Sequence, residues 1–349
     1  MRQPQALMGG ARLTGALLCV FLALLTAAWI ARDIHAADGL ADLWWFWTGA
    51  PKHRGSAPLT TGFADLVLLL VYAVAAVVVP RSPVAAAVLV CVGAVTAALR
   101  VSSLWVLHDH WTDSTALHDL HRRAVLSTFA ALAAGLALVI TAAAGRGPRD
   151  AGAPPGPVRP GAGAGIAACV LLGAAAAVAV AWEVYWADRL PGAVYRRRFS
   201  GDGLPLLWLP AGWTTAVVAV VALTAAGGGA ARAVFARPLG LIGAAFFTAS
   251  GLTGLTLAVR FELFDHYGDL STSDQLTVVT WIFQLAAGLA LLPVLARRGP
   301  VDPADAAGTG LPPGQWPPYP PQDGHPGGFG PPPPGFGPPP PPSSPPPGW

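Results

Sequence analysis

The chain has 349 residues, of which 54% are hydrophobic and only 11% carry a charge. Soluble globular domains carry a charge on roughly 25% of their residues, so this composition excludes an ordinary soluble protein and indicates an integral membrane protein. The formal net charge of +3 comes mostly from arginines that flank apolar stretches without forming a basic face, which argues against a nucleic-acid partner.

Eight apolar stretches follow one another along the chain, each close to the roughly 20 residues that an α-helix needs to cross the hydrocarbon core of a bilayer. The first lies at 13–31. It is not interpreted as a signal peptide, because Ala28-Trp29 recurs as Ala181-Trp182 in a later stretch. The other stretches lie at about 59–79, 83–106, 124–144, 163–183, 211–231, 239–259 and 276–296. We therefore expect an all-α, polytopic membrane protein with eight transmembrane helices.

A short pattern, Asp-His-aromatic-x-Asp, occurs twice between apolar stretches, at Asp109–Asp113 and at Asp265–Asp269. Each copy is preceded by an Ala-x-Arg sequence and followed by the helix sequence Ala-Ala-Gly-Leu-Ala-Leu. We therefore predict two tandem four-helix repeats, at 1–144 and at 163–298, with a Gly- and Pro-rich linker at 145–162. An even number of spans in each repeat gives both copies the same orientation, related by an axis along the membrane normal.

The C-terminal region has a composition that cannot form a packed core, since more than half of the 36 prolines follow Asp302. We expect residues 299–349 to be a disordered tail with polyproline II character. It is either a solvated extension or a ligand for a protein partner with an aromatic groove. The Ala-, Gly-, Arg- and Pro-rich composition of the whole chain resembles that of membrane proteins from high-GC actinobacteria, a resemblance that implies no site residues.

Orientation is predicted from the loops. On one side the loops carry arginines nearly free of carboxylates, which favours a cytoplasmic location for that side and for both termini in the plasma membrane. Tryptophans concentrate on the opposite, outer side, especially at 40–47 and 204–213. Such elements either anchor the protein at the surface of the lipid bilayer or form an aromatic cap that lines a ligand site.

All histidines except His325 lie in predicted outer loops, so the outer face is where we place the candidate chemistry. The repeated pattern supplies the ligand or ion candidates Asp109, His110, Asp113, Asp265, His266 and Asp269. A divalent metal could be held by His108, His110, His118 and His121, because imidazole and carboxylate suit zinc-type coordination. The alternative is that the carboxylates cap helix N-termini. No organic cofactor is expected.

Charged residues within apolar stretches are costly and need a partner. Asp65 and Arg100 stand roughly 22–26 Å from the turn at 80–83 on antiparallel neighbours, because a helix rises 1.5 Å per residue. This matching height predicts an ion pair. In the second repeat Arg260 corresponds to Arg100, and its predicted acid is Glu183, with Glu262 as the competitor. These pairs are either structural or form a cluster that handles protons or cations.

The sequence contains no nucleotide-binding loop, nucleophile elbow or zinc-protease helix, which makes an intramembrane enzyme the third choice. The preferred function is a non-enzymatic membrane protein that senses, scaffolds or binds with its outer cap. The alternative is a small-solute or cation transporter with its site at the repeat interface. A transporter would be expected to have broken helices or polar residues near the bilayer midplane. The spans are mostly unbroken Ala, Val and Leu, which favours the first function.

Overall fold

The computed structural model describes residues 5–51, 58–106, 115–148, 159–200 and 205–297. This part of the chain is almost entirely helical, and the predicted tail at 299–349 lies outside it. The helices are α1 (Gly9–Ala36), α2 (Leu40–Trp47), α3 (Phe63–Val78), η1 (Val79–Arg81), α4 (Ala85–Arg100), α5 (Ser103–Val106), α6 (Thr115–Ala144), α7 (Ala162–Arg189), α8 (Gly192–Ser200), α9 (Ala211–Ala230), α10 (Ala236–Arg260), η2 (Tyr267–Asp269) and α11 (Thr272–Ala296). Two short strands, β1 (Gln5–Leu7) and β2 (Arg146–Pro148), pair with each other.

Seven of the described helices are long and apolar enough to cross a membrane, namely α1, α3 with η1, α6, α7, α9, α10 and α11. The chain is therefore a multi-pass α-helical membrane protein, as its composition predicts. The stretch predicted at 83–106 differs, because α4 has only 16 residues. At 1.5 Å per residue it extends about 24 Å, less than the ~30 Å hydrocarbon core. Ser102 contributes to this early end, since its hydroxyl donates to the carbonyl of Leu99 at 2.8 Å.

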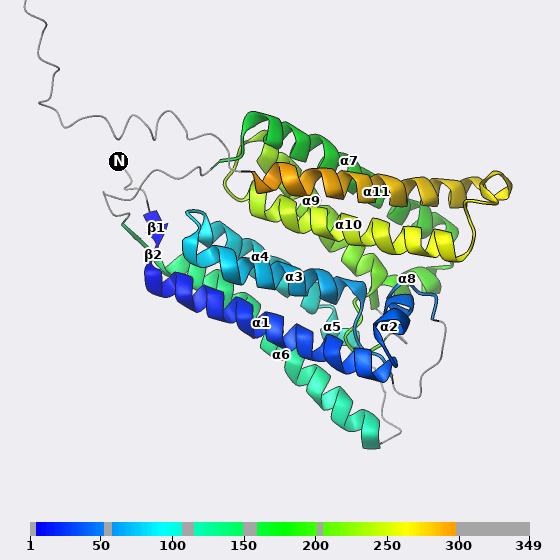
Figure 1. Cartoon of the computed structure of the whole chain (residues 1–349), viewed down its shortest axis with the longest axis horizontal. Helices are drawn as coiled ribbons and strands as arrows, with labels where there is room; N and C mark the ends of the chain where they lie inside the picture. Colours follow the sequence, from blue (N-terminus) through cyan, green and yellow to red (C-terminus); the bar gives the residue numbers. More distant parts are fainter. Residues whose placement is uncertain (1–4, 52–57, 107–114, 149–158, 201–204, 298–349) are drawn as a thin grey trace, which may run out of the picture. The chain divides into compact units, whose positions relative to one another are not determined.

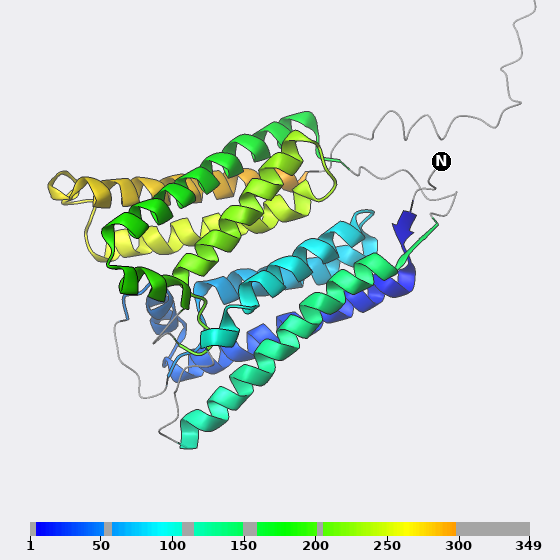
Figure 2. The ribbon, with the colours of Figure 1, turned by 180° about the vertical axis from the view of Figure 1, so that it is seen from behind.

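The long helices form two groups (Figures 1 and 2). In the first group, α1 packs against α3 and α6, and α4 packs against α6. In the second group, α7 packs against α9 and α11, and α10 packs against α9 and α11. The groups meet where α10 contacts α3 and α4 and where α4 also contacts α9.

Small residues let the helices approach closely. A Cβ added to Gly93 of α4 would clash with the backbone oxygen of Gly135 in α6, and one added to Gly165 of α7 would lie 2.6 Å from the backbone oxygen of Gly229 in α9. Lipid tails are as apolar as the helices, so helix association in a bilayer depends on this close van der Waals packing. Glycine at these crossings therefore positions the helices within each group.

Short elements distinguish the two ends of the bundle. We call the end that carries α2, α5, α8 and residues 58–62 and 205–210 the cap end, and β1 and β2 lie at the opposite end (Figure 1). There, Leu7 of β1 pairs with Arg146 of β2, which joins the start of α1 to the end of α6. At the cap end, the backbone N–H of Leu207 donates to the carbonyl of Thr60 at 3.1 Å. This bond joins one segment from each group.

Candidate functional site

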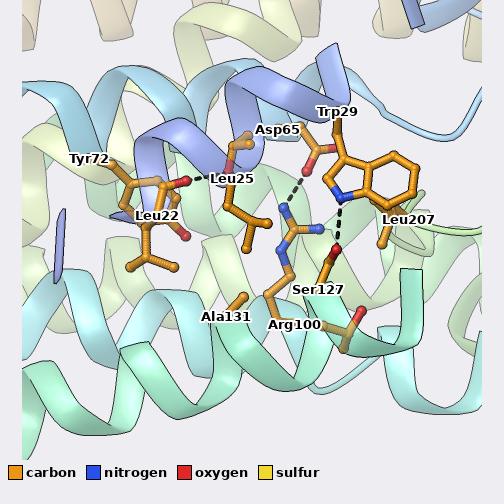
Figure 3. A pocket seen from close by; sticks show the side chains of 11 residues that line it. Leu22, Leu25, Trp29, Asp65, Tyr72, Arg100, Ser127, Ala131 and Leu207 are labelled. Atoms are coloured by element: carbon orange, nitrogen blue, oxygen red, sulfur yellow. Dashed lines mark hydrogen bonds and ion pairs between the residues drawn. The ribbon is translucent and has the colours of Figure 1, made fainter. Parts of the chain in front are cut away.

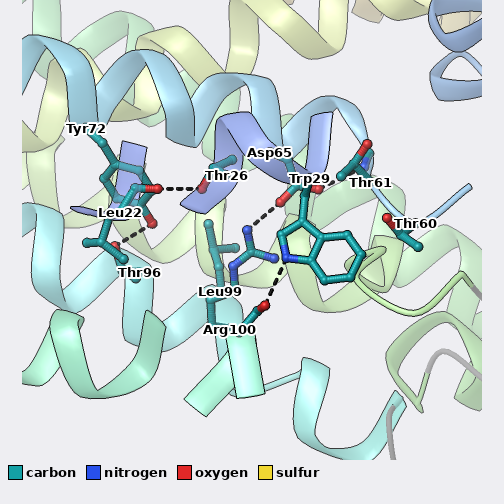
Figure 4. A network of polar contacts seen from close by, with 12 residues as sticks. Leu22, Thr26, Trp29, Thr60, Thr61, Asp65, Tyr72, Thr96, Leu99 and Arg100 are labelled. Carbon is teal, nitrogen blue, oxygen red and sulfur yellow. Dashed lines mark hydrogen bonds and ion pairs between the residues drawn. The ribbon is translucent and has the colours of Figure 1, made fainter. Parts of the chain in front are cut away.

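A network of buried polar side chains lies toward the cap end of the first helix group (Figure 4). Its first centre is Asp33, which is fully buried in the last turns of α1. Its Oδ2 accepts hydrogen bonds from the backbone N–H groups of Thr60 and Thr61 at 2.8 and 2.7 Å and from their hydroxyls at 3.1 and 2.8 Å. Arg32 donates to Oδ1 at 2.7 Å and to the carbonyl of Pro58 at 2.5 Å. Asp33 thus fastens residues 58–61 to α1.

The second centre is Asp65 in the first turn of α3. One carboxylate oxygen accepts from the backbone N–H of Gly62 at 2.8 Å, which forms a capping box at the start of the helix. The other oxygen accepts from Nη2 of Arg100, the last residue of α4. The side chains of Asp65 and Arg100 are only 2% and 7% exposed. The structure therefore brings these two residues together as a buried, hydrogen-bonded ion pair.

The polar contact between α3 and α4 continues away from the cap. The hydroxyl of Tyr72 lies 2.9 Å from Oγ1 of Thr96, and both residues are buried (Figure 4). Thr96 donates its hydroxyl proton to the carbonyl of Val92 at 2.8 Å, so Tyr72 is the donor in the first bond. Tyr72 lies two helical turns below Asp65, about 10 Å along α3. The two helices thus share a polar seam that begins at the ion pair.

A cavity of about 20 Å³ lies beside the ion pair (Figure 3). Its lining includes Leu22, Thr26 and Trp29 of α1, Ser127 and Ala131 of α6, and Leu207. A cavity of this size holds about one water molecule. Nε1 of Trp29 donates to Oγ of Ser127 at 2.9 Å and so joins α1 to α6 at its edge. The cavity has room for one water molecule and is too small for an organic solute.

The ion pair predicted between Glu183 and Arg260 is not the pair that forms. Oε1 of Glu183 accepts from Nη2 of Arg198 at 2.6 Å, because α8 turns back beside the end of α7. The guanidinium of Arg260 instead lies 5.7 Å from the ring centroid of Trp45 in α2, a cation–π contact between the two helix groups. Glu262, the predicted competitor, is exposed in the turn that leaves α10.

The repeated Asp-His pattern is described in its second copy only, since Asp109, His110 and Asp113 lie outside the described residues. Asp265, His266 and Asp269 are exposed in the loop between α10 and α11. The capping role weighed for this loop belongs to another residue, because Oγ of Ser271 accepts from the backbone N–H of Asp274 at 3.3 Å at the start of α11. The second copy is therefore loop surface, available for contact.

Only two of the four histidines proposed to bind a metal lie among the described residues. His108 and His110 lie outside the described residues, while His118 and His121 lie near the start of α6. Within the described part of the chain, no group of three or more His, Cys, Asp or Glu side chains is placed to hold a metal ion. The metal site remains an expectation about the undescribed segment at 107–114.

Asp33 was not identified from the sequence, although it has the most hydrogen-bond partners in the network. The signal was the pair Thr60-Thr61, which stands directly before Gly62 and the start of α3 at Phe63. The apolar stretch predicted at 59–79 includes both threonines. In the structure they precede α3 and bind the carboxylate of Asp33.

No protein-family model, no curated protein and no solved structure matches this chain. In the polar network, all four carboxylate oxygens of Asp33 and Asp65 accept hydrogen bonds from nearby residues of the chain. These charges hold loop segments at the cap end.

Proposed function

We propose that the chain is a non-enzymatic protein of the plasma membrane that binds, senses or scaffolds at its cap end, which faces outward. The observation that carries this proposal is that the buried carboxylates bind the segment that precedes α3. Asp33 and Asp65 hold residues 58–62 against α1 and α3, so the charged groups in the bundle support the cap. A site for catalysis or transport would instead need charges that are open to a substrate.

Contacts across the cap end support a rigid binding surface. Phe46 of α2 meets the ring of Trp208 edge-on, with centroids 5.2 Å apart. Nε1 of Trp213, in α9, donates to the carbonyl of Ala98 in α4 at 2.7 Å. Both contacts join the first helix group to the second, as does Leu207 with Thr60. Alternating access by rocking of one repeat against the other would have to break them.

The loop between α10 and α11 supplies a surface of the kind that binds a partner. Phe261, Phe264 and Tyr267 are exposed there, and Glu262 and Asp265 are exposed between them. Aromatic side chains are enriched in protein interfaces, where they contribute much of the contact energy. We infer that this loop belongs to the binding surface.

We also infer that the two helix groups are tandem repeats. Nε1 of Trp29 donates to Ser127 at 2.9 Å and Nε1 of Trp182 donates to Thr280 at 3.0 Å, and in both bonds the partners are 98 positions apart. These bonds join α1 to α6 and α7 to α11, so they occupy equivalent places. In Figures 1 and 2, α1 and α7 begin at the same end of the bundle, so the chain must cross the membrane an even number of times from the start of α1 to the start of α7. The long helices α1, α3 and α6 give three crossings, and α4 supplies the fourth. This favours α4 as the eighth span.

The matched tryptophan bonds lead to a test of the repeat. Trp29→Phe and Trp182→Phe should each lower the free energy of unfolding in detergent by about 0.5–1.5 kcal/mol, because each removes one hydrogen bond and leaves an acceptor without its donor. The two losses should be similar. Each substitution should then be repeated in the Ser127→Ala or Thr280→Val background. A loss that persists undiminished there would show that the hydrogen bond is not its source.

A small-solute or cation transporter is the second candidate, and one observation favours it. Oγ of Ser250 donates to Oε1 of Gln284 at 2.9 Å near the middle of α10 and α11. Polar groups at mid-membrane depth often mark a solute path. At the same level, however, an added Cβ on Gly251 would lie 2.6 Å from the backbone oxygen of Trp281. Helices this close leave little room for a solute, so we rank transport second.

Cysteine labelling in intact cells separates the two candidates and tests the orientation. Single cysteines would be placed at Ala193 and Tyr267 in the cap, at Arg81 at the opposite end, and at Thr26 and Ser250 inside the bundle, in a background without Cys19, Cys91 and Cys169. An impermeant maleimide added outside should label only the cap positions, and one added to inverted vesicles only Arg81→Cys. Labelling of Ser250→Cys from both sides would support transport instead. Labelling of Ala193→Cys only in inverted vesicles would reverse the orientation.

A further inference from the structure

A second and larger cavity, of about 230 Å³, lies between α7, α8 and α9, away from the network around Asp65. Its walls are mostly apolar and include Ala179 and Val184 of α7, Ala216 and Ala219 of α9, and Phe199 of α8. An apolar cavity of about 150 Å³ already binds benzene. This cavity therefore has room for a segment of an alkyl chain.

The ion pair between Glu183 and Arg198 contains two buried polar atoms that have no hydrogen-bond partner among the described residues. Its Oε1 is bound to Arg198, whereas its Oε2 is buried and has no hydrogen-bond partner among the described residues. Nε of Arg198 is likewise buried without a partner in this part of the chain. Both atoms belong to the Glu183–Arg198 ion pair, and Glu183 is one of the residues that line the cavity. Buried polar groups are nearly always hydrogen bonded, so these two atoms indicate a ligand group that both donates and accepts, such as a hydroxyl.

The position of the cavity indicates where such a ligand comes from. Glu183 lies about 32 Å along α7 from Ala162, at 1.5 Å per residue, which matches the ~30 Å thickness of the hydrocarbon core. The carboxylate is therefore at headgroup level, while Ala179 lies one turn deeper. Val180 and Val184 line the cavity and are also 47% and 64% exposed on the surface of α7. The cavity is thus accessible from the bilayer.

Charge at the rim favours an anionic headgroup. Arg196 and Arg197 are exposed on α8, and Arg189 is exposed at the end of α7. The charge of Glu183 is balanced by Arg198 and that of Arg189 by the neighbouring Asp188, so Arg196 and Arg197 leave this region positive. Arginine binds phosphate through paired N–H donors, which suits it to a phospholipid headgroup.

We propose that this cavity binds one glycerophospholipid whose anionic headgroup carries a hydroxyl, with phosphatidylglycerol as the simplest example. A segment of one acyl chain lies between α7 and α9. A headgroup hydroxyl donates to Oε2 of Glu183 and accepts from Nε of Arg198, and the phosphate faces Arg196 and Arg197. This binding is independent of the function proposed for the cap.

Native mass spectrometry of the full chain tests the proposal. The protein would be released from vesicles that contain equal amounts of phosphatidylglycerol, phosphatidylmethanol and phosphatidylcholine. The wild type should retain one phosphatidylglycerol, in about tenfold excess over either competitor. Phosphatidylmethanol has the same charge without the hydroxyl, and phosphatidylcholine has no net charge, so the two competitors separate the two parts of the headgroup. Equal retention of all three lipids would overturn the proposal.

Two substitutions on α9 provide a matched pair for this measurement. Ala216→Phe fills the cavity and should abolish the retained lipid, whereas Val220→Phe, one turn away at a lipid-exposed position outside the lining, should keep it. Glu183→Gln should reduce the preference for phosphatidylglycerol over phosphatidylmethanol to about onefold. Each variant is checked for a monodisperse elution profile before analysis. Retention of phosphatidylglycerol by a folded Ala216→Phe variant would show that the lipid binds elsewhere.

Discussion

Replacing Asp65 with asparagine is expected to lower the free energy of unfolding by about 3–5 kcal/mol, because Arg100 would stay buried without its counter-charge. Arg100→Gln should have a similar effect, since it leaves the carboxylate of Asp65 in the same buried place. The loss can be measured as a shift in the thermal or denaturant unfolding curve of the protein in detergent. The capping hydrogen bond from Gly62 remains available to the amide oxygen of the introduced asparagine, so the change isolates the charge.

The double variant Asp65→Asn with Arg100→Gln should lose less than the sum of the two single losses, because no buried charge is left without a partner. Asp188 and Arg189 provide the control. They are 3.9 Å apart and largely exposed, so Arg189→Gln should change stability by less than about 1 kcal/mol. Strictly additive losses for Asp65 and Arg100 would show that the two side chains do not interact.

The second large effect is expected at the contact of α10 with α11. A Cβ added to Gly251 would lie 2.5 Å from the backbone nitrogen of Leu285 and 2.6 Å from the backbone oxygen of Trp281. Backbone atoms cannot rotate away as a side chain does, so Gly251→Ala must separate the helices. Overpacking of this kind typically costs about 1–3 kcal/mol, and we expect the upper part of that range from unfolding in detergent.

Gly227→Ala in α9 is the matched control for this prediction. Nothing lies within 4 Å of a Cβ at that position, and Ala favours a helix over Gly by about 1 kcal/mol. This variant should be neutral or slightly more stable. If Gly251→Ala behaved in the same way, α10 and α11 would not be in close contact at this level.

Features set by local sequence could be predicted. The multi-pass architecture follows from apolar length alone, because hydrocarbon requires about 20 apolar residues whatever the neighbouring helices do. The heights of Asp65 and Arg100 could be compared because the short turn at 80–83 fixes the register of α3 against α4. The extent of α4 could not be predicted from composition, because the apolar pattern continues past Arg100 and does not show where the backbone leaves the helix near Ser102.

Contacts that depend on how a loop folds back onto a helix could not be predicted. Glu183 binds Arg198 because α8 turns back beside α7, and nothing in the hydrophobic pattern indicates that turn. Asp33 depends in the same way on Thr60 and Thr61, which reach it from the far side of a long connection. Which polar side chains meet across a loop depends on the tertiary structure, and the hydrophobic pattern of a single sequence does not show this.

The short strands at the end opposite the cap have a consequence for the order of assembly. β1 pairs with β2 and the N–H of Met8 donates to the carbonyl of Gly145 at 2.9 Å, so the first group of helices is closed from its beginning to its end. Domains generally fold as units during synthesis, N-terminal first. Once Pro148 has left the ribosome, every strand and helix of that group is available, so the first group can pack before α7 follows it out. In that order of assembly, the contacts of α3 and α4 with α9 and α10 form last.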